Sequence, residues 1–210
     1  MIIIGAKGFA KEILEILHQK GETNGLCFYD DISYDLPEKL FGKFPILRNE
    51  DEARTYFSTI DSKFSIGIGN PKLRRMLYEK FTKLGGIYTS TISSKAEIGS
   101  FGVEIGDGCN ILGGARISND VKIGKGTMVY YNAIITHDVE IGDFVEISPG
   151  ATLLGRCKID NNTQIGAGAI IFPDVEIGEN CIIAAGAVVR NNIPNSTMAA
   201  GIPATVKKQL

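Results

Sequence analysis

The sequence predicts two domains of different class: a small α/β domain over residues 1–88, and an all-β parallel β-helix over residues 89–210. In the second half, every sixth residue from position 105 to position 189 is aliphatic. In the first half, short apolar runs alternate with glycine turns and with apolar residues at helical spacing. The composition, 25 glycines and no tryptophan, is unusual enough to prompt a search for repeats before any helix is assigned.

The second half repeats with a period of six residues. No amphipathic helix or ordinary strand keeps this phase over such a length, whereas each face of a parallel β-helix uses one hexapeptide and each coil uses three. We expect the large residues to fill the interior and the small or β-branched residues four positions later to fit the corners. The large position is occupied by Ile105, Ile111, Ile117, Ile123, Val129, Ile135, Ile141, Ile147, Leu153, Ile159, Ile165, Ile171, Ile177, Ile183 and Val189.

Two local features refine this prediction. Glycines such as Gly106, Gly124 and Gly142 directly follow a large residue, where the backbone is expected to turn. The pattern extends backwards to Ile98, but the step from Ile98 to Ile105 is seven residues, so residues 100–102 are expected to form a small bulge or an irregular corner. The repeat contains no insertion, and an active site must therefore lie on its faces or edges.

The first 88 residues alternate strands and helices. The sequence predicts strands over residues 1–4, 26–29 and 64–69, and helices that begin at Phe9, near residues 49–52, and at Asn70-Pro71. This alternation is typical of a small parallel sheet of Rossmann type.

The strands of such a sheet end at one shared edge. Residues 5–8, Asp30-Asp31 and Gly69-Asn70 should therefore meet at one crevice. The amides of a glycine turn at a helix N-terminus suit phosphate, and paired carboxylates suit ribose hydroxyls or base N–H groups. The crevice therefore suits a nucleotide, although a purely structural glycine turn and a solvated pair of aspartates explain the same residues.

Composition excludes several classes of protein. The 22 Lys+Arg against 24 Asp+Glu give a formal charge of −2, which disfavours binding to nucleic acid. No apolar run approaches the roughly 20 residues of a membrane span, and the N-terminus lacks the pattern of a signal peptide. We therefore expect a soluble cytoplasmic protein. The four cysteines, Cys27, Cys109, Cys157 and Cys181, form no CxxC pair and are expected to be buried free thiols.

The chain has two histidines with different expected roles. His18 lies near the end of the first predicted helix and is expected at the surface. His137 lies two residues after the inward Ile135, so it should project from the solenoid, and Asp138 follows it directly. Imidazole is a base of near-neutral pKa, and an adjacent carboxylate can orient it. His137 is therefore a candidate general base, although a lone exposed histidine is also often incidental.

The combination of the two halves resembles the hexapeptide-repeat acyltransferases. Over nearly its whole length the chain is similar to bacterial nucleotide-sugar acetyltransferases, such as the N-acetyltransferases of the UDP-bacillosamine precursor, GDP-perosamine and dTDP-viosamine, and to related sialic acid O-acetyltransferases. Residues 199–204 also resemble the Gly-x-Pro-Ala tail of this family, although turn chemistry alone would explain them. The resemblance implies a left-handed β-helix, a homotrimer, and acetyl-CoA bound between neighbouring solenoids.

The resemblance also implies site residues. His137 and Asp138 would be the catalytic pair, and the backbone N–H of Gly155, at the same position one coil further on, would bind the thioester oxygen. Acetyl-CoA would contact Glu146, Gly155, Ala167 and Ala185, and the nucleotide sugar would contact Gly5, Lys7, Gly8, Phe9, Asp30, Asp31, Gly69 and Asn70. The sequence departs from the family at Phe9 and Glu146, where many members carry histidine.

The favoured function is an acetyl-CoA-dependent N-acetyltransferase that acts on the amino group of a nucleotide-linked amino-deoxy sugar. The alternative is O-acetylation of a sugar hydroxyl, as in the sialic acid type. A zinc enzyme such as the hexapeptide carbonic anhydrases is disfavoured, because His137 is the only histidine of the repeat and such sites use three, so no metal is expected. A non-catalytic solenoid would need a regular threonine ladder or a broad apolar face.

Overall fold

The structure is a computed structural model that describes all 210 residues. The chain divides into two compact units, Met1–Thr91 and Ile92–Leu210. The division falls after residue 91, whereas the boundary drawn from the sequence falls after residue 88. No helix of the structure combines the length and the apolar character that a membrane span requires.

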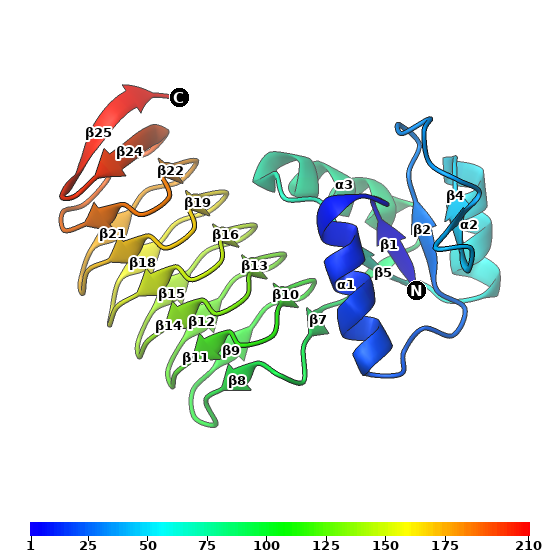
Figure 1. The fold of residues 1–210 in the computed structure, drawn as a ribbon, viewed down its shortest axis with the longest axis horizontal. Helices are drawn as coiled ribbons and strands as arrows, with labels where there is room; N and C mark the ends of the chain where they lie inside the picture. Colours follow the sequence, from blue (N-terminus) through cyan, green and yellow to red (C-terminus); the bar gives the residue numbers. More distant parts are fainter. The chain divides into compact units, whose positions relative to one another are not determined.

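The N-terminal unit is an α/β domain built on one sheet. Its strands are β1 (Ile2–Ile4), β2 (Cys27–Tyr29), β3 (Lys39–Leu40), β4 (Phe44–Leu47), β5 (Lys63–Ile66) and β6 (Ile87–Tyr88), and they lie in the order β3-β4-β2-β1-β5-β6. Figure 1 labels the four strands β4, β2, β1 and β5. All pairs are parallel except the hairpin of β3 and β4. The central strand β1 is completely buried, as expected of a strand covered on both faces.

Three helices connect these strands: α1 (Gly8–Gln19), α2 (Glu50–Thr59) and α3 (Pro71–Lys83). Two begin with a side-chain cap, because Asn49 Oδ1 accepts from the amide of Glu52 and Asn70 Oδ1 accepts from the amide of Leu73, each at 3.0 Å. These starts agree with the sequence. The strands β3, β4 and β6 were not predicted; β4 contains Pro45, and proline disfavours a strand assignment.

The second unit is a solenoid with three flat faces, which fits a left-handed β-helix (Figure 1). The first face consists of β7 (Thr91–Ile92), β10 (Asn110–Ile111), β13 (Met128–Val129), β16 (Glu146–Ile147), β19 (Gln164–Ile165) and β22 (Ile182–Ile183). The second consists of β8 (Glu97–Ile98), β11 (Arg116–Ile117), β14 (Ile134–Ile135), β17 (Thr152–Leu153), β20 (Ile170–Ile171) and β23 (Val188–Val189). The third consists of β9 (Glu104–Ile105), β12 (Lys122–Ile123), β15 (Glu140–Ile141), β18 (Lys158–Ile159) and β21 (Glu176–Ile177).

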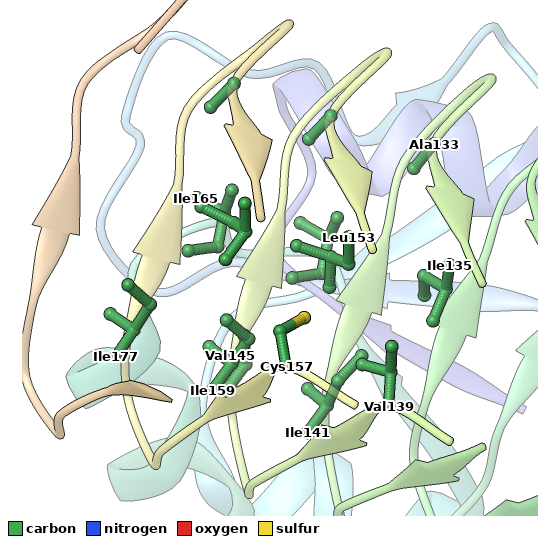
Figure 2. Packing of buried hydrophobic residues seen from close by; sticks show 14 of the residues in the cluster. Ala133, Ile135, Val139, Ile141, Val145, Leu153, Cys157, Ile159, Ile165 and Ile177 are labelled. Atoms are coloured by element: carbon green, nitrogen blue, oxygen red, sulfur yellow. The ribbon is translucent and has the colours of Figure 1, made fainter. Parts of the chain in front are cut away.

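The interior is filled as the period predicts. Neighbouring coils pair in parallel with a shift of three hexapeptides, as between Ile135 and Leu153. Figure 2 shows the large residues of successive coils, among them Ile135, Leu153 and Ile165, stacked in rows inside the solenoid with Ala133 and Cys157 at its corners. All four cysteines are buried free thiols, as predicted, and burial raises the pKa of Cys157 to about 12. The Cys157 thiol is therefore a neutral packing group.

The glycines after the large residues are required for a different reason from the one expected. Gly106 and Gly142 do not adopt the left-handed conformation; Gly108 and Gly126, three positions after a large residue, do. A methyl group at Gly106 would lie 2.7 Å from the backbone nitrogen of Lys125 in the next coil. Glycine is needed there because successive coils approach too closely for a side chain.

The solenoid is irregular at both ends. Ile98 pairs with Ile117, one residue further along the chain than in a regular coil, whereas Ile105 pairs with Ile123 at the regular spacing. The extra residue therefore lies in the turn between β8 and β9, which is an irregular corner. At the other end, β24 (Thr197–Gly201) lies beside β22, and β25 (Ala204–Gln209) folds back antiparallel to β24. The segment 199–204 is therefore the turn of a hairpin with parts of both of its strands, and the Ile202-Pro203 bond is cis.

Candidate active site

His137 lies in the turns that join the second face to the third. We call this edge the second corner; it consists of residues 118–121, 136–139, 154–157 and 172–175. Because every coil has the same length in this part of the solenoid, corresponding residues form columns along this corner. One column contains His137, Gly155 and Pro173, and the next contains Asp120, Asp138, Arg156 and Asp174.

His137 and Asp138 form a close pair at the surface. Nδ1 of His137 lies 2.6 Å from Oδ2 of Asp138, and both side chains are about half exposed, at 56% and 50%. Asp138 has a φ of 58°, a left-handed conformation that aspartate tolerates better than most residues. An ionised carboxylate can only accept, so Nδ1 carries the imidazole proton and Nε2 presents its lone pair. Nε2 has no hydrogen-bond partner within the protein and is open to a substrate.

The imidazole ring lies directly against Gly155 of the next coil. A methyl group at Gly155 would lie 2.7 Å from Cε1 and 2.9 Å from Nε2 of His137, closer than any real side chain permits. The amide of Gly155 donates no hydrogen bond within the protein. A groove of about 570 Å³ on the second face reaches this ring and is lined by Arg116, Ile134 and Thr136. A base, an unused amide and a groove thus lie together at this corner.

An ion pair one coil beyond Asp138 was not predicted. Arg156 donates from Nε and Nη2 to the two carboxylate oxygens of Asp174, at 2.6 and 2.9 Å. These hydrogen bonds hold the pKa of Asp174 below its usual range. Arg156 and Asp174 are one coil apart in the repeat, so the period alone could have predicted that their side chains are neighbours.

The other residues assigned to acetyl-CoA lie elsewhere on the solenoid. Glu146 is on the first face, where its carboxylate accepts from the side-chain amide of Gln164 at 2.8 Å. Ala167 and Ala185 are one coil apart in the turns between the first and second faces, which we call the first corner. Within one chain, these three residues are therefore not on the corner that carries His137 and Gly155.

In the N-terminal unit, the predicted crevice residues meet at the carboxyl edge of the sheet. The amide of Gly5 donates to the carbonyl of Tyr29 at 2.7 Å, and the amide of Gly67 donates to the carbonyl of Ile4 at 2.7 Å. These bonds place the ends of β2, β1 and β5 side by side. Gly5 has a φ of 95°, which a side chain would strain. The residue before α1, Lys7, makes no side-chain capping hydrogen bond.

Two charged side chains at this edge are held by partners that the sequence did not indicate. Lys7 Nζ donates to Asp35 at 2.7 Å, and this bond lowers the pKa of the Asp35 carboxyl. Oδ2 of Asp31 accepts from the Tyr29 hydroxyl at 2.9 Å and lies 3.5 Å from Nζ of Lys80. The other carboxylate oxygen of Asp31 has no hydrogen-bond partner within the protein. These partners are 28 and 49 residues away in sequence, with no shared motif to reveal them.

The remaining predicted crevice residues have structural contacts. Oδ1 of Asp30 accepts from the amide of Ser33 at 2.8 Å and thus forms a turn. Phe9 is only 8% exposed and packs in the core beside the turn at Gly8. The carbonyl of Gly69 accepts from the guanidinium of Arg74. Asn70 caps α3, as described above.

The segment that follows Asp30 is anchored by one arginine. The guanidinium of Arg48 donates to four backbone carbonyls, those of Asp30, Ser33, Leu36 and Pro37, at 3.0 to 3.3 Å. This segment, residues 30–37, borders the carboxyl edge of the sheet. Arg48 therefore fixes the shape of a loop that no regular element supports. No cluster of three or more metal-ligating side chains is present in the structure.

Comparison with protein families matches both units. Residues 1–81 match the PglD N-terminal domain family, and residues 120–155 and 156–191 match the bacterial transferase hexapeptide (six repeats) family. The match to the PglD N-terminal domain family thus covers most of the first unit, and the matches to the hexapeptide family lie within the second. The resemblance drawn from the sequence is thus confirmed.

Several solved structures are similar to this protein over almost its whole length. A histidine variant of perosamine N-acetyltransferase from Caulobacter crescentus, in complex with CoA and GDP-perosamine, is 28% identical with a TM-score of 0.91, over 99% of this chain and 96% of that chain. The acetyltransferase domain of PglB from Neisseria gonorrhoeae FA1090, in complex with acetyl coenzyme A, is 26% identical with a TM-score of 0.87, over 98% of both chains.

WeeI from Acinetobacter baumannii AYE is 28% identical with a TM-score of 0.89, again over 98% of both chains. No curated protein sequence matches the chain significantly.

Proposed function

We propose that this protein is an acetyl-CoA-dependent N-acetyltransferase that acts on the amino group of a nucleotide-linked amino-deoxy sugar. The observation that carries the proposal is the pair of His137 and Asp138, with Nε2 open and the ring against Gly155. The substrate class is supported by full-length similarity to an N-acetyltransferase solved with CoA and GDP-perosamine and to an acetyltransferase domain solved with acetyl coenzyme A.

The geometry of the second corner suits proton transfer. Nε2 of His137 takes a proton from the sugar amine as the new C–N bond forms, and gives a proton to the departing CoA sulfur as the C–S bond breaks. Asp138 holds the ring by its Nδ1–H and stabilises the imidazolium that forms between these steps. Acetyl-CoA supplies the acetyl group as a thioester.

The unused amide of Gly155 fits the thioester carbonyl. Because Gly155 has no side chain, its backbone is accessible beside the imidazole, and its N–H donates to no other group of the protein. A donor placed there would stabilise the negative charge that develops on the carbonyl oxygen, which is the role of an oxyanion hole.

We assign nucleotide binding to the N-terminal unit, residues 1–88 in the division drawn from the sequence, and acetyl-CoA binding and catalysis to residues 89–210. When the hairpin strand β3 is left out, the order across the sheet is β4-β2-β1-β5-β6. If these five strands are counted along the chain, that order is 3-2-1-4-5, as in the nucleotide-binding half of a Rossmann-like fold. The turn between Gly5 and Gly8 would receive the phosphates, with Lys7 as a cation beside them. The free oxygen of Asp31 would accept from a ribose hydroxyl or a base N–H.

We also infer that the acetyl-CoA site is completed by a second copy of the chain, as in a homotrimer. Glu146, Ala167 and Ala185 lie on the first face and first corner, away from the second corner that carries Gly155. If all these residues contact one acetyl-CoA molecule, then the first corner of one solenoid must face the second corner of its neighbour.

The test is a CoA-release assay with acetyl-CoA against UDP-, dTDP- and GDP-linked 4-amino-4,6-dideoxy sugars. We expect turnover with one nucleotide class and a loss of about 10²- to 10⁴-fold in His137→Ala, the usual contribution of a general base. The matched control is His18→Ala, because His18 is the only other histidine and is exposed at the end of α1. This control should retain full activity.

Two results would contradict the proposal. Activity that survives His137→Ala would mean that another residue is the base. If no amino sugar turns over but free or CMP-linked sialic acid does, the protein is an O-acetyltransferase of the sialic acid type. Asp31→Asn separates acetylation of a nucleotide-linked sugar from O-acetylation of free sialic acid, since it should impair only a reaction whose acceptor carries a nucleotide.

A further inference from the structure

Arg156 stands between two carboxylates in one column of the second corner. Asp138 is one coil before it and Asp174 is one coil after it. Neighbouring strands in such a stack are about 4.8 Å apart, so the backbone of Arg156 is equally near to both acids. The guanidinium can therefore pair with either one.

In the structure it pairs with Asp174. Two hydrogen bonds, at 2.6 and 2.9 Å, join the planar guanidinium to both oxygens of that carboxylate. These bonds and the charge of Asp174, followed by the weaker charge of Asp138, raise the pKa of Arg156. The guanidinium thus lies within the field of Asp138 while bonded to the other acid. Asp138 is left with His137 Nδ1 as its partner, at 2.6 Å.

An arginine is unexpected at this position. The residues of this column have positive φ, at 55° for Asp120, 58° for Asp138, 63° for Arg156 and 62° for Asp174. Aspartate tolerates that conformation, whereas a long side chain without special reason is uncommon there. Strain of this kind persists where the surrounding structure requires the residue, and functional sites are where it gathers.

We propose that Asp174 is a positioning residue for the catalytic pair: by binding Arg156, it leaves the carboxylate of Asp138 to His137. This inference rests on the proposed role of His137 as the base. A guanidinium donates two parallel bonds to a carboxylate and would compete strongly with a single imidazole N–H. If Arg156 turned to Asp138, His137 would lose the bond that keeps its proton on Nδ1, and Nε2 would spend part of the time protonated and inactive as a base.

The experiment compares Asp174→Asn with the double variant Asp174→Asn/Arg156→Gln. Asparagine tolerates positive φ as aspartate does, and it removes the charge that holds Arg156. We expect kcat/KM to fall about tenfold in the single variant, a fraction of what a general base contributes, with little change in the KM for acetyl-CoA. Removal of Arg156 should restore most of that loss, because no competitor for Asp138 remains.

The tautomer of His137 gives a readout that does not depend on turnover. With ¹⁵N-labelled histidine, the side-chain shifts of His137 should show the proton on Nδ1 in the parent and in the double variant, and a mixture of tautomers in Asp174→Asn. His18 provides an internal reference in every spectrum. The matched control is Glu104→Gln, which removes the acid of another coil-to-coil ion pair, with Lys122 at 3.9 Å on the third face; it should change neither readout.

The proposal fails if Asp174→Asn leaves the tautomer of His137 unchanged, or if the double variant is as impaired as the single one. It also fails if Glu104→Gln reproduces the effect, because any lost surface ion pair would then suffice. A parent protein without acetyltransferase activity would contradict the proposed function, and the tautomer measurement would still decide whether Asp174 positions His137.

Discussion

The ring of His137 is positioned by the absence of a side chain at Gly155. The imidazole lies so close to Gly155 that a Cβ at residue 155 would clash with it. On its other side, Nδ1 of the ring contacts the carboxylate of Asp138. The ring is thus supported from two neighbouring coils. This arrangement orients Nε2 without any hydrogen bond to that atom, which leaves its lone pair free for a proton.

Gly155→Ala should therefore impair catalysis more than stability. The new methyl group would displace the imidazole, and a displacement of about 1 Å in a catalytic group can cost about 100-fold in rate. We expect kcat to fall by about that factor while the melting temperature changes little. Steady-state kinetics with thermal unfolding of the same preparation measures both.

Asn191→Ala is the control for this change, because Asn191 is exposed in the turn that follows β23, two coils further on and away from the ring. It should behave as the parent does. Full activity in Gly155→Ala would show that the ring has room to move without loss of function.

The contact between His137 and Asp138, which we propose as the catalytic pair, could be predicted because both the period and the chemistry pointed to these residues. The period placed His137 outside the solenoid, and Asp138 is its neighbour in sequence. Arg156 and Asp174 could have been found from the same period, but arginine and aspartate are common on surfaces and carried no chemical signal. The contact between Asp31 and Lys80 could not have been predicted, because the two residues are 49 positions apart in the sequence.

At the level of elements, the loop of residues 30–37 depends on one side chain from the end of β4. Arg48 donates to four of its carbonyls, and each would otherwise need water or another donor. The loop carries both Asp31 and Asp35, the partner of Lys7. Its order therefore determines where two charged groups of the proposed nucleotide site lie.

Arg48→Gln should weaken binding of the nucleotide sugar. A loop that is mobile before binding must be ordered by the ligand, at the expense of affinity. We expect KM for the nucleotide sugar to rise about tenfold, equivalent to roughly 1.4 kcal/mol, with KM for acetyl-CoA unchanged. Arg54→Gln, at an exposed position of α2, is the control. An equal rise in both KM values would instead indicate a general loss of structure.

Elements with strong local signals were predicted and those without them were not. Residues close together in the sequence determine the capped starts of α2 and α3 and the period of the solenoid. The hairpin of β3 and β4 depends on a turn at Phe41-Gly42, where both residues have positive φ, and phenylalanine is not a residue that predicts such a turn. Strand β6 has only two residues and pairs with β5 through tertiary contact.

At the scale of the whole molecule, the solenoid has one continuous core in which each internal coil packs on two others. Leu153 is completely buried between Ile135 and Ile171 of the adjacent coils. Loss of packing at one coil therefore affects its neighbours on both sides.

Leu153→Ala should destabilise the protein by about 2–5 kcal/mol, the usual cost of a cavity left by leucine in a well-packed core. Denaturant unfolding followed by circular dichroism measures this change in the free energy of unfolding. Thr152→Ala, whose side chain is on the outer surface of the same strand, should cost much less. If Leu153→Ala costs as little free energy of unfolding as Thr152→Ala, the core at this coil relaxes to fill the cavity.

The hairpin of β24 and β25 covers the last coil of the solenoid and disfavours polymerisation. A stack of parallel coils exposes unpaired backbone groups at its last coil, and such an edge could recruit the first coil of another molecule. Here β24 occupies that edge beside β22, and β25 then reverses direction, so the next available strand runs antiparallel and carries Lys207 and Lys208 (Figure 1). A mismatched direction and repelling charges make end-to-end fibre growth unfavourable on this face.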